Sequence, residues 1–540
     1  MIYTEKELGR YWPLILLTAI SLIFLPQIAL FELSGTEAAF SQVAQDLTNG
    51  QSVGTPSLQG QYVDTRPLYP ILISLFSFGA SPNDISVHLP SILGLLIMCF
   101  SAAWVTFRHS NRQAAAVAGL IVLSSYASLR FATKAEPHLL GAALISCSWL
   151  TLYEISRDTK NWHIAWLSAL GFSFLGYLCI GAHSFFFFYF PLLFLRRPTD
   201  IRKRLLKAPH LIAFTGLCLL TFLYFSHNHN FVKNTGAFSL NAPFSALWPD
   251  SGYLFKVLRF PFTCFTYLLP WAFFAWAPYC EALRPLEKDK VLYHYLRTIT
   301  VSLFLIICFL PGAGAENLLP LLSPIAIMIA LHYSILIRRH RVYFELLQKY
   351  LLGLNVLAIL GLFGSLAAIH FKKWSIPVEP KTLQWILISL ACALIINLFF
   401  FTKPVKNLPA WLKILVATVL LFWSIQCFKS LPRHGHQTQR QIAQEFLSLL
   451  PQNASIYSFP DKEGKSLYYP LAHYLNQPVK MILSEDNDEK WPQTIYVITQ
   501  DKTPSGMTKN PAFFLWEASS KVYIGPKGQK CQLWKGTVRK

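Results

Sequence analysis

Residues 12–31 read WPLILLTAISLIFLPQIALF, and residues 32–67 continue as ELSGTEAAFSQVAQDLTNGQSVGTPSLQGQYVDTRP. The first stretch is an apolar run of about the 20 residues that a helix needs to cross a bilayer. The second places several carboxylates directly behind that run: Glu32, Glu37, Asp46 and Asp64. Carboxylates at a membrane boundary are costly to desolvate unless they are paired or used. We therefore treat this loop as a candidate functional site.

Apolar runs of similar length recur along the chain as far as Phe428, and 53% of the 540 residues are hydrophobic while 14% are charged. A lipid-embedded backbone must satisfy its own hydrogen bonds, and these runs lack the alternation of barrel strands. The sequence therefore predicts an all-α polytopic membrane protein with about thirteen transmembrane helices. The predicted spans lie near residues 12–31, 86–107, 113–129, 138–153, 163–180, 183–195, 209–226, 261–279, 298–314, 317–337, 350–370, 382–401 and 410–428. The apolar segment 67–80 is short and opens with proline, so we expect it to lie at the interface.

Lysine and arginine gather in alternate loops, as in segments 196–207 and 338–341, whereas the first loop is net acidic. The positive-inside rule then predicts a cytoplasmic N-terminus and places loop 32–67 outside. The same loops account for most of the net charge of +20. We expect contacts with membrane lipids and no nucleic-acid partner. The short connections favour a bacterial inner membrane, with the periplasm as the outer compartment.

A change of composition divides the chain into residues 1–428 and residues 429–540. The first part is the predicted transmembrane domain, with a first outer loop at 32–85 and a lid-like outer loop at 227–260. The second part is more polar, and its amphipathic segment QTQRQIAQEFLSLL precedes the short apolar runs ASIYSF, VKMIL and TIYVIT. This pattern predicts a small extracytoplasmic α/β domain with a structural or acceptor-recognition role. The ten cysteines show no disulfide framework or zinc motif.

Several short motifs recur at the predicted outer ends of the helices: TEAAF (36–40), DTRPLY (64–69), HLPS (88–91), FATKAEPH (131–138), LPW (269–271) and LLP (318–320). In this order they resemble the motifs of GT-C glycosyltransferases, especially the aminoarabinose transferase and protein O-mannosyltransferase group. The resemblance covers most of the chain and implies thirteen spans with an exported C-terminal domain. Three positions depart from the family pattern. Thr36 stands at a position that is Asp in the family, His138 replaces another Asp, and Glu316 replaces a basic residue.

The resemblance implies a hexosyl- or pentosyltransferase that moves a sugar from a polyprenyl-phosphate donor to an envelope acceptor: lipid A or lipopolysaccharide, another glycan, or a protein. An acceptor hydroxyl needs a carboxylate to remove its proton during attack. We expect Glu37 to be that base, with Glu136 and Asp64 beside it, while Glu32 and Asp46 have solvated or packing roles. The leaving phosphate needs positive charge. The candidates are Arg66, Arg130, Lys134 and Arg259.

A divalent cation is a possible cofactor because several carboxylates gather on one face, and Glu136 and His138 are possible ligands. These residues do not decide whether a metal is bound, or which metal it would be. Two other functions remain open from the sequence. A transporter or flippase of lipid-linked glycans would show charges deep within several spans and repeated halves, and neither is conspicuous. An inactive member that binds a lipid-linked sugar would explain Thr36, His138 and Glu316.

Overall fold

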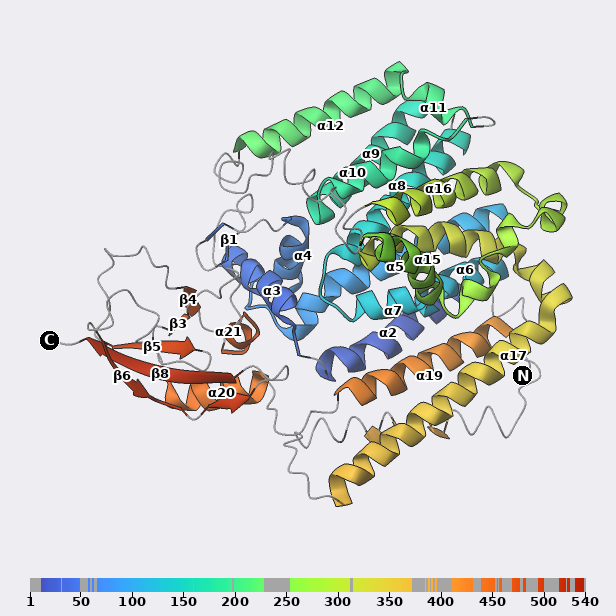
Figure 1. Cartoon of the computed structure of the whole chain (residues 1–540). Helices are drawn as coiled ribbons and strands as arrows, with labels where there is room; N and C mark the ends of the chain where they lie inside the picture. The colour runs from blue at the N-terminus through green and yellow to red at the C-terminus, as the bar shows by residue number, and fades with distance from the viewer. Residues whose placement is uncertain are drawn as a thin grey trace.

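Helices make up most of the structure (Figure 1). The computed structural model describes residues 11–30, 32–48, 57–58, 61–62, 66–158, 160–196, 199–227, 253–310, 314–371, 384, 387–388, 390–391, 394–395, 410–430, 439–451, 454, 456–458, 469–475, 479–481, 494–499, 514–520, 522–524 and 530–538. The helical part contains α2 (Trp12–Leu30), α3 (Gly35–Thr48), α4 (Leu68–Phe76), α5 (Asp84–His109), α6 (Arg112–Ser124), α7 (Tyr126–Ala132), α8 (His138–Asp158), α9 (Trp162–Ile180), α10 (His183–Leu192), α11 (Ile201–Arg204), α12 (Ala208–His227), α15 (Tyr253–Leu268), the 3-10 helices η2 (Trp271–Phe274), η3 (Ala277–Tyr279) and η4 (Glu281–Leu286), then α16 (Lys290–Phe309), η5 (Ala315–Leu321), α17 (Leu322–Phe371) and α19 (Ala410–Ser430).

In the described part of the chain, six spans are long and apolar enough to cross a membrane, or up to eight if each bent pair of helices counts as one. The bent pairs are α6 with α7, at 59°, and α15 with the turns that follow it, at 103°. The chain is therefore an integral membrane protein, but thirteen spans are not confirmed. Helix α10 has 10 residues, well short of the roughly 20 that a span needs. The predicted spans 317–337 and 350–370 correspond to two of the six, Ala315–Arg339 and Arg341–Gly364, which are joined within α17. Most of the predicted span 382–401 lies outside the described residues.

Local sequence sets where several of these helices begin. Asn83 caps α5 by accepting a hydrogen bond from Ser86 N, and the Ser86 hydroxyl accepts from Asn83 N in return. Asn111 and Asn161 cap α6 and α9 in the same way, through their side-chain oxygens. Such caps satisfy amide groups that have no partner inside the helix. Helix α4 has 9 residues, which is too short to cross a bilayer and agrees with the interfacial prediction for 67–80.

A sheet follows the helical part in the strand order β4-β3-β5-β8-β6, with β7 paired to β8. Its strands are β3 (Ile456–Ser458), β4 (Val479–Met481), β5 (Thr494–Thr499), β6 (Phe514–Ala518), β7 (Tyr523–Ile524) and β8 (Lys530–Val538). Strand β3 is parallel to β4 and β5, whereas β8 is antiparallel to β5 and β6. The helices α20 (Gln439–Leu449) and α21 (Tyr469–Leu475) pack on this sheet through Ile442, Phe446 and Leu471. The amphipathic helix and three strands thus form where the sequence predicts them.

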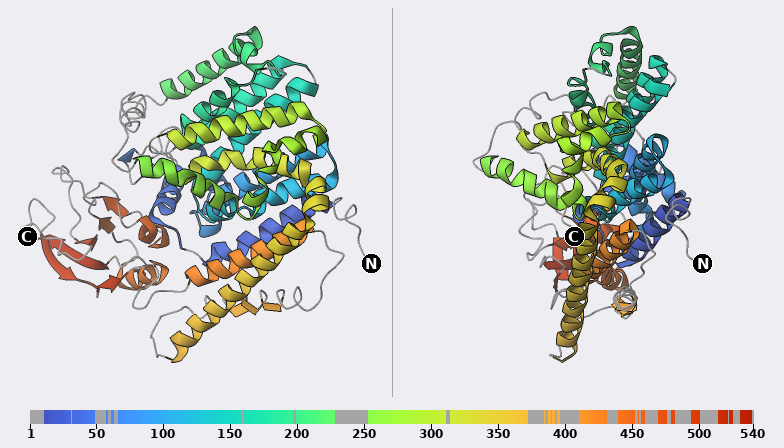
Figure 2. Two further views of the ribbon diagram at one scale, coloured as in Figure 1. Left: turned by 45° about the vertical axis from the view of Figure 1, so that its right-hand side comes forward. Right: turned by 90° about the vertical axis from the view of Figure 1, so that its right-hand side faces the viewer.

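The sheet lies beside α3 and α4 at one end of the helical bundle, which we call the sheet-side end (Figure 1). Helix α17 runs from η5 to the opposite end, bends there and returns (Figure 2), so that it contributes to two candidate spans, Ala315–Arg339 and Arg341–Gly364. A network of charged groups ties α5, α8 and α16 together at that opposite end. His109 lies 2.8 Å from Asp289 and 2.7 Å from Glu154, and Arg157 pairs with Asp289. The two ends therefore differ, and the motifs quoted above gather at the sheet-side end.

Candidate active site at the sheet-side end

Glu37 stands in the first turn of α3, where its carboxylate holds two backbone amides. Ser34 N donates to its Oε2 at 2.5 Å, which is the glutamate half of a capping box written in the sequence as Ser34-Gly35-Thr36-Glu37. Its Oε1 accepts a hydrogen bond from Ala135 N at 3.0 Å. Glu37 is 6% exposed. The side chain therefore fixes the start of α3 and joins it to the turn between α7 and α8.

A second polar chain joins the other motifs to the same turn. The ring of Tyr69 packs edge-on against Phe40 with centroids 5.4 Å apart. Its hydroxyl lies 2.8 Å from Ser91 Oγ, which donates to the carbonyl oxygen of Glu136 at 3.1 Å. Burial raises the pKa of Tyr69 well above its usual value, so the phenol stays neutral and can donate. Segments 36–40, 66–69, 88–91 and 131–138 thus form one unit.

Lys134 and Glu136 form an ion pair on the turn that Glu37 holds. Lys134 Nζ lies 3.4 Å from Glu136 Oε1, and the Glu136 side chain is 16% exposed. One turn of helix earlier, Arg130 donates to the hydroxyl of Tyr267 at 2.8 Å and lies over its ring. Tyr267 comes from the end of α15, so this contact brings a third part of the chain to the turn. Two cations, Arg130 and Lys134, and the carboxylate of Glu136 therefore lie on one stretch of the chain at this edge of the bundle.

Arg66, two residues before α4, reaches the C-terminal end of α9. Its guanidinium packs on Gly181, where an added Cβ would lie 2.8 Å from Arg66 Nε. Gly181 has φ +77°, a conformation that favours glycine. Arg66, His138 and Glu316 all act electrostatically on His183 at the start of α10. Glu316 also acts on Tyr267 from η5, which contacts α7, α8 and α15.

The structure adds residues that the sequence analysis did not select. Tyr267, Gly181 and His183 read as packing residues in their apolar segments, and no motif marks them. Glu316 departs from the family pattern, and its carboxylate acts electrostatically on His183 together with Arg66 and on Tyr267 together with Arg130. A carboxylate in that place offsets part of the positive charge of the arginines. Glu316 in place of a basic residue thus makes the net charge of the site less positive.

Other predicted residues are not brought to this unit. Asp64 lies outside the described residues, as do residues 228–252 of the lid-like loop. Arg259 is exposed on α15, eight residues before Tyr267, and so roughly 12 Å away along the helix axis. Glu32 has a different role from the solvated or packing one expected. Its carboxylate accepts hydrogen bonds from Gln439 N at 3.0 Å and from Arg440 N at 2.9 Å.

The metal prediction finds no donor set among the residues that the structure describes. Within them, no group of three or more His, Cys, Asp or Glu side chains could hold a metal ion. Glu136 is paired with Lys134, and His138 packs edge-on against the ring of Phe131. A hard divalent cation takes several oxygen ligands, and these two residues do not supply them. We therefore assign no step to a metal.

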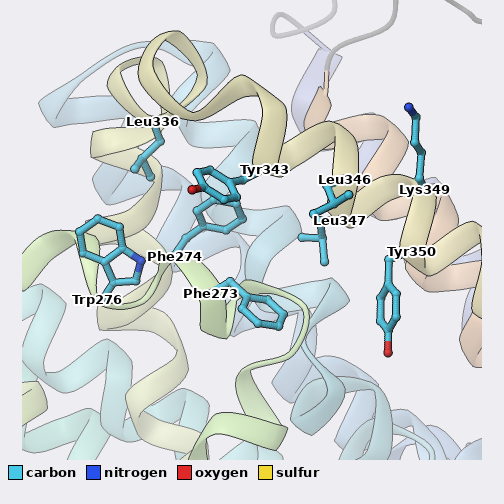
Figure 3. Close-up of a pocket in the computed structure, with 9 residues that line it drawn as sticks. All are labelled: Phe273, Phe274, Trp276, Leu336, Tyr343, Leu346, Leu347, Lys349 and Tyr350. Carbon is cyan, nitrogen blue, oxygen red and sulfur yellow. The ribbon is translucent and has the colours of Figure 1, made fainter.

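A cavity of about 900 Å³ lies apart from the candidate site (Figure 3). It opens between the 3-10 turns after α15 and the second arm of α17. Its lining is aromatic and aliphatic with one lysine: Phe273, Phe274, Trp276, Leu336, Tyr343, Leu346, Leu347, Lys349 and Tyr350. None of the predicted site residues lines it. The cavity therefore does not enter the chemistry assigned below.

Comparison with known proteins gives a fold but no sequence relative. No family model matches the chain, and no curated protein sequence matches it. The solved structure of ArnT from Cupriavidus metallidurans bound to undecaprenyl phosphate matches with a TM-score of 0.71 and 13% identity, over 97% of this chain and 98% of that one. The same protein in the apo state matches with a TM-score of 0.69 and 14% identity, over 97% of each chain. The chain therefore shares the fold of ArnT over most of its length, as the resemblance of its motifs led us to expect.

Proposed function

We propose that this protein transfers a sugar from a polyprenyl phosphate to a hydroxyl group of an envelope acceptor. The observation that carries the proposal is the hydrogen bond from Ala135 N to Glu37, which unites the acidic first loop with the Lys134–Glu136 turn. Acids and cations thereby meet at one end of an apolar bundle. The shared fold adds support, since the matching ArnT structure holds undecaprenyl phosphate.

The cations are suited to the phosphate of the donor. Arg66, Arg130 and Lys134 approach the sheet-side end from the start of α4, from α7 and from the turn after α7. Charge-assisted hydrogen bonds from guanidinium and ammonium groups stabilise phosphate oxygens as negative charge develops on them. Tyr267 holds Arg130 by its hydroxyl, and Gly181 leaves room for Arg66. Both neighbours therefore orient cations for the leaving group.

Glu136 is the carboxylate that an acceptor hydroxyl can reach. A general base must come within roughly 2.6–3.2 Å of the proton that it removes. The side chain of Glu136 is 16% exposed and pairs with Lys134, whereas Glu37 is buried and holds two backbone amides. We assign the base to Glu136 and a positioning role to Glu37. This assignment reverses the order of preference drawn from the sequence.

The acceptor is an envelope glycolipid such as lipid A, another glycan or a protein, and the sugar is a hexose or a pentose. The sheet-side end would face the periplasm from a bacterial inner membrane, with the N-terminus in the cytoplasm. The basic ends of α5 and α8 at the opposite end support that orientation. The sheet domain, residues 429–540, would then stand where an acceptor arrives. Helices α20 and α21 would contribute to acceptor recognition.

The test is a transfer assay with the purified protein in lipid vesicles. Labelled polyprenyl-phosphate hexoses and pentoses are offered with an envelope acceptor fraction, and labelled acceptor is measured. Transfer from one donor supports the proposal and names the sugar. Two results contradict it: labelled lipid that crosses the bilayer without transfer indicates a transporter, and donor binding without either activity indicates an inactive binding protein.

A further inference from the structure

We propose that the sheet domain positions α3, and with it Glu37, through a polar cluster centred on Asp84. We call Glu32, Ser41, Asp84, Arg440, His473 and Tyr474 the Asp84 cluster. The functional part of this inference rests on the proposed sugar transfer. Its structural part stands on contacts alone, between residues about 350 to 440 positions apart in the chain.

Asp84, the first residue of α5, receives three side chains from the sheet domain. Its Oδ1 lies 3.2 Å from His473 Nε2 and 3.3 Å from the Tyr474 hydroxyl. Its Oδ2 pairs with the guanidinium of Arg440. Arg440 comes from α20, and the other two residues come from α21. One carboxylate of the helical bundle therefore joins both helices of the sheet domain.

His473 and Tyr474 also bind the segment that begins just before α3 and ends in its second turn. His473 Nδ1 lies 2.8 Å from Ser41 Oγ, and Ser41 stands one helical turn after Glu37. The Tyr474 hydroxyl accepts a hydrogen bond from Leu33 N at 3.1 Å, just before the capping box. In a neutral His473 ring, Nε2–H donates to Asp84, and Nδ1 is then free of a proton and accepts a hydrogen bond from the Ser41 hydroxyl. The helix that carries Glu37 is thus clamped from the sheet side.

Glu32, in the loop before α3, contacts the sheet domain through the start of α20. Its carboxylate accepts from the amides of Gln439 and Arg440, the first two residues of α20. Amides at a helix start lack partners within the helix and favour a negative charge. The loop before α3 therefore caps a helix of the sheet domain, while that domain holds α3. Loss of the Glu32 contact with α20 would weaken the contacts of α21 with α3, and the reverse also holds.

Ser41, His473 and Asp84 are hydrogen-bonded in the order of a Ser-His-Asp catalytic triad. The burial of Ser41 excludes that role. Ser41 is 1% exposed, so no substrate can reach its Oγ within bonding distance. It also lies inside α3, where its hydroxyl points into the interface with α21. A buried polar chain whose members are all bonded specifies one packing arrangement. The chain through His473 therefore orients α3 and does not attack a substrate.

Positioning has a consequence for the turn that carries Glu136. Glu37 holds Ala135 N at 3.0 Å, so a displaced α3 would release the turn between α7 and α8. A small displacement of a reacting group lowers the rate of the chemical step much more than it weakens substrate binding. The same turn carries Lys134, but Arg66 and Arg130 do not lie on it. Weakening the Asp84 cluster should thus lower kcat by a larger factor than it raises the KM for the donor.

The experiment compares hydrogen exchange and kinetics in the full-length protein reconstituted in nanodiscs. Tyr474→Phe removes the acceptor for Leu33 N while keeping the ring. Asp84→Arg and Arg440→Asp each break the ion pair, and the double variant restores it with reversed charges. Ser448→Ala, on α20 but outside the cluster, is the control. We expect Tyr474→Phe and both single charge variants to exchange amides of α3 and of Ala135 at least about tenfold faster. We expect kcat to fall about tenfold or more. The double variant should recover only the part of both values that depends on the ion pair, because an arginine at position 84 cannot accept the hydrogen bonds of His473 and Tyr474.

The exchange measurement separates the two proposals because it needs no activity. If the wild type transfers no sugar, the proposed function fails, and faster exchange in the variants still supports the clamp on α3. Exchange at the wild-type rate in Tyr474→Phe and in both charge variants overturns the inference. Faster exchange with unchanged kcat overturns the positioning role.

Discussion

Ala135 N donates a hydrogen bond to Glu37 Oε1 at 3.0 Å, although the two residues stand 98 positions apart. The contact joins the first turn of α3 to the turn that carries Lys134 and Glu136. Just before α3, Leu33 N donates to the Tyr474 hydroxyl of the sheet domain. Glu37 thus couples the acidic loop to the turn of the candidate base, and Tyr474 ties the same loop to the C-terminal domain.

Replacing Glu37 with glutamine should destabilise this junction. Both carboxylate oxygens accept backbone N–H groups, and an amide can accept through one of its two ends only. One buried donor then loses its partner, which costs about 1–3 kcal/mol of unfolding free energy. Thermal unfolding in detergent measures the loss. Thr36→Ala, at the exposed neighbouring position, is the control, and equal stability of the two variants would contradict the junction.

Gly181→Ala should displace the guanidinium of Arg66. The added Cβ would lie 2.8 Å from Arg66 Nε, and the backbone at φ +77° disfavours a side chain. If Arg66 binds the donor phosphate, losing one charge-assisted hydrogen bond should raise the donor KM by about tenfold. The matched control is Gly171→Ala in α9, where nothing lies within 4 Å of the added Cβ. A KM that stays at the wild-type value in Gly181→Ala would remove Arg66 from the donor site.

Gly94 makes the closest approach between α5 and α8. A Cβ at this position would lie 2.6 Å from Leu140 Cα, so the two backbones would have to separate. Gly94→Ala should therefore destabilise the bundle by about 1–3 kcal/mol, measured by thermal unfolding. Gly353→Ala in α17 meets no atom within 4 Å, and it should be neutral or slightly stabilising. The packing at this crossing is refuted if both variants unfold at the same temperature.

Acid should weaken the charged network at the opposite end. Burial alone would raise the pKa of Asp289, but hydrogen bonds from His109, from Leu292 N and from Arg157 hold it well below its usual range. A lowered pKa stabilises the folded state above the unfolded value of about 3.9 and loses that effect as the pH falls below it. The stability difference between wild type and Asp289→Asn should be constant from pH 7 to 5 and shrink below about pH 4.

Glu281→Gln is the control variant for the pH dependence of Asp289→Asn. Glu281 pairs with Arg284, but its side chain is 88% exposed, and exposed pairs contribute little. Its unfolding temperature should follow the wild type at every pH. A difference between wild type and Asp289→Asn that grows as the pH falls would show that Asp289 does not stabilise the network as an anion.

The sequence predicts which motifs share an end of the bundle, because apolar runs of spanning length bring alternate loops to the same side. It therefore anticipates the union of segments 36–40, 66–69, 88–91 and 131–138. It also anticipates two spans on either side of the basic segment 338–341, which correspond to Ala315–Arg339 and Arg341–Gly364, but it does not anticipate that the segment itself is helical. No proline or glycine interrupts the chain between Pro324 and Gly353, so the helix continues through that segment.

Contacts that depend on tertiary packing have no local signal. His473 lies 389 positions from Asp84, and neither residue belongs to a motif. Tyr267 sits in an apolar run, and only its hydrogen bond from Arg130 marks it. Gly181 is recognisable once its φ is known. Glu136, by contrast, was selected because it stands in an otherwise apolar turn, and the structure places it beside Lys134.

The most direct test of the account is the rate of sugar transfer by Glu136→Gln, measured beside the wild type under saturating donor in the same vesicles. The glutamine keeps the shape of the side chain but cannot remove a proton from the acceptor. We expect kcat to fall by about 10²–10⁴-fold, with donor binding and unfolding temperature unchanged. Transfer at the wild-type rate by a folded Glu136→Gln protein would contradict the assignment of Glu136 as the base.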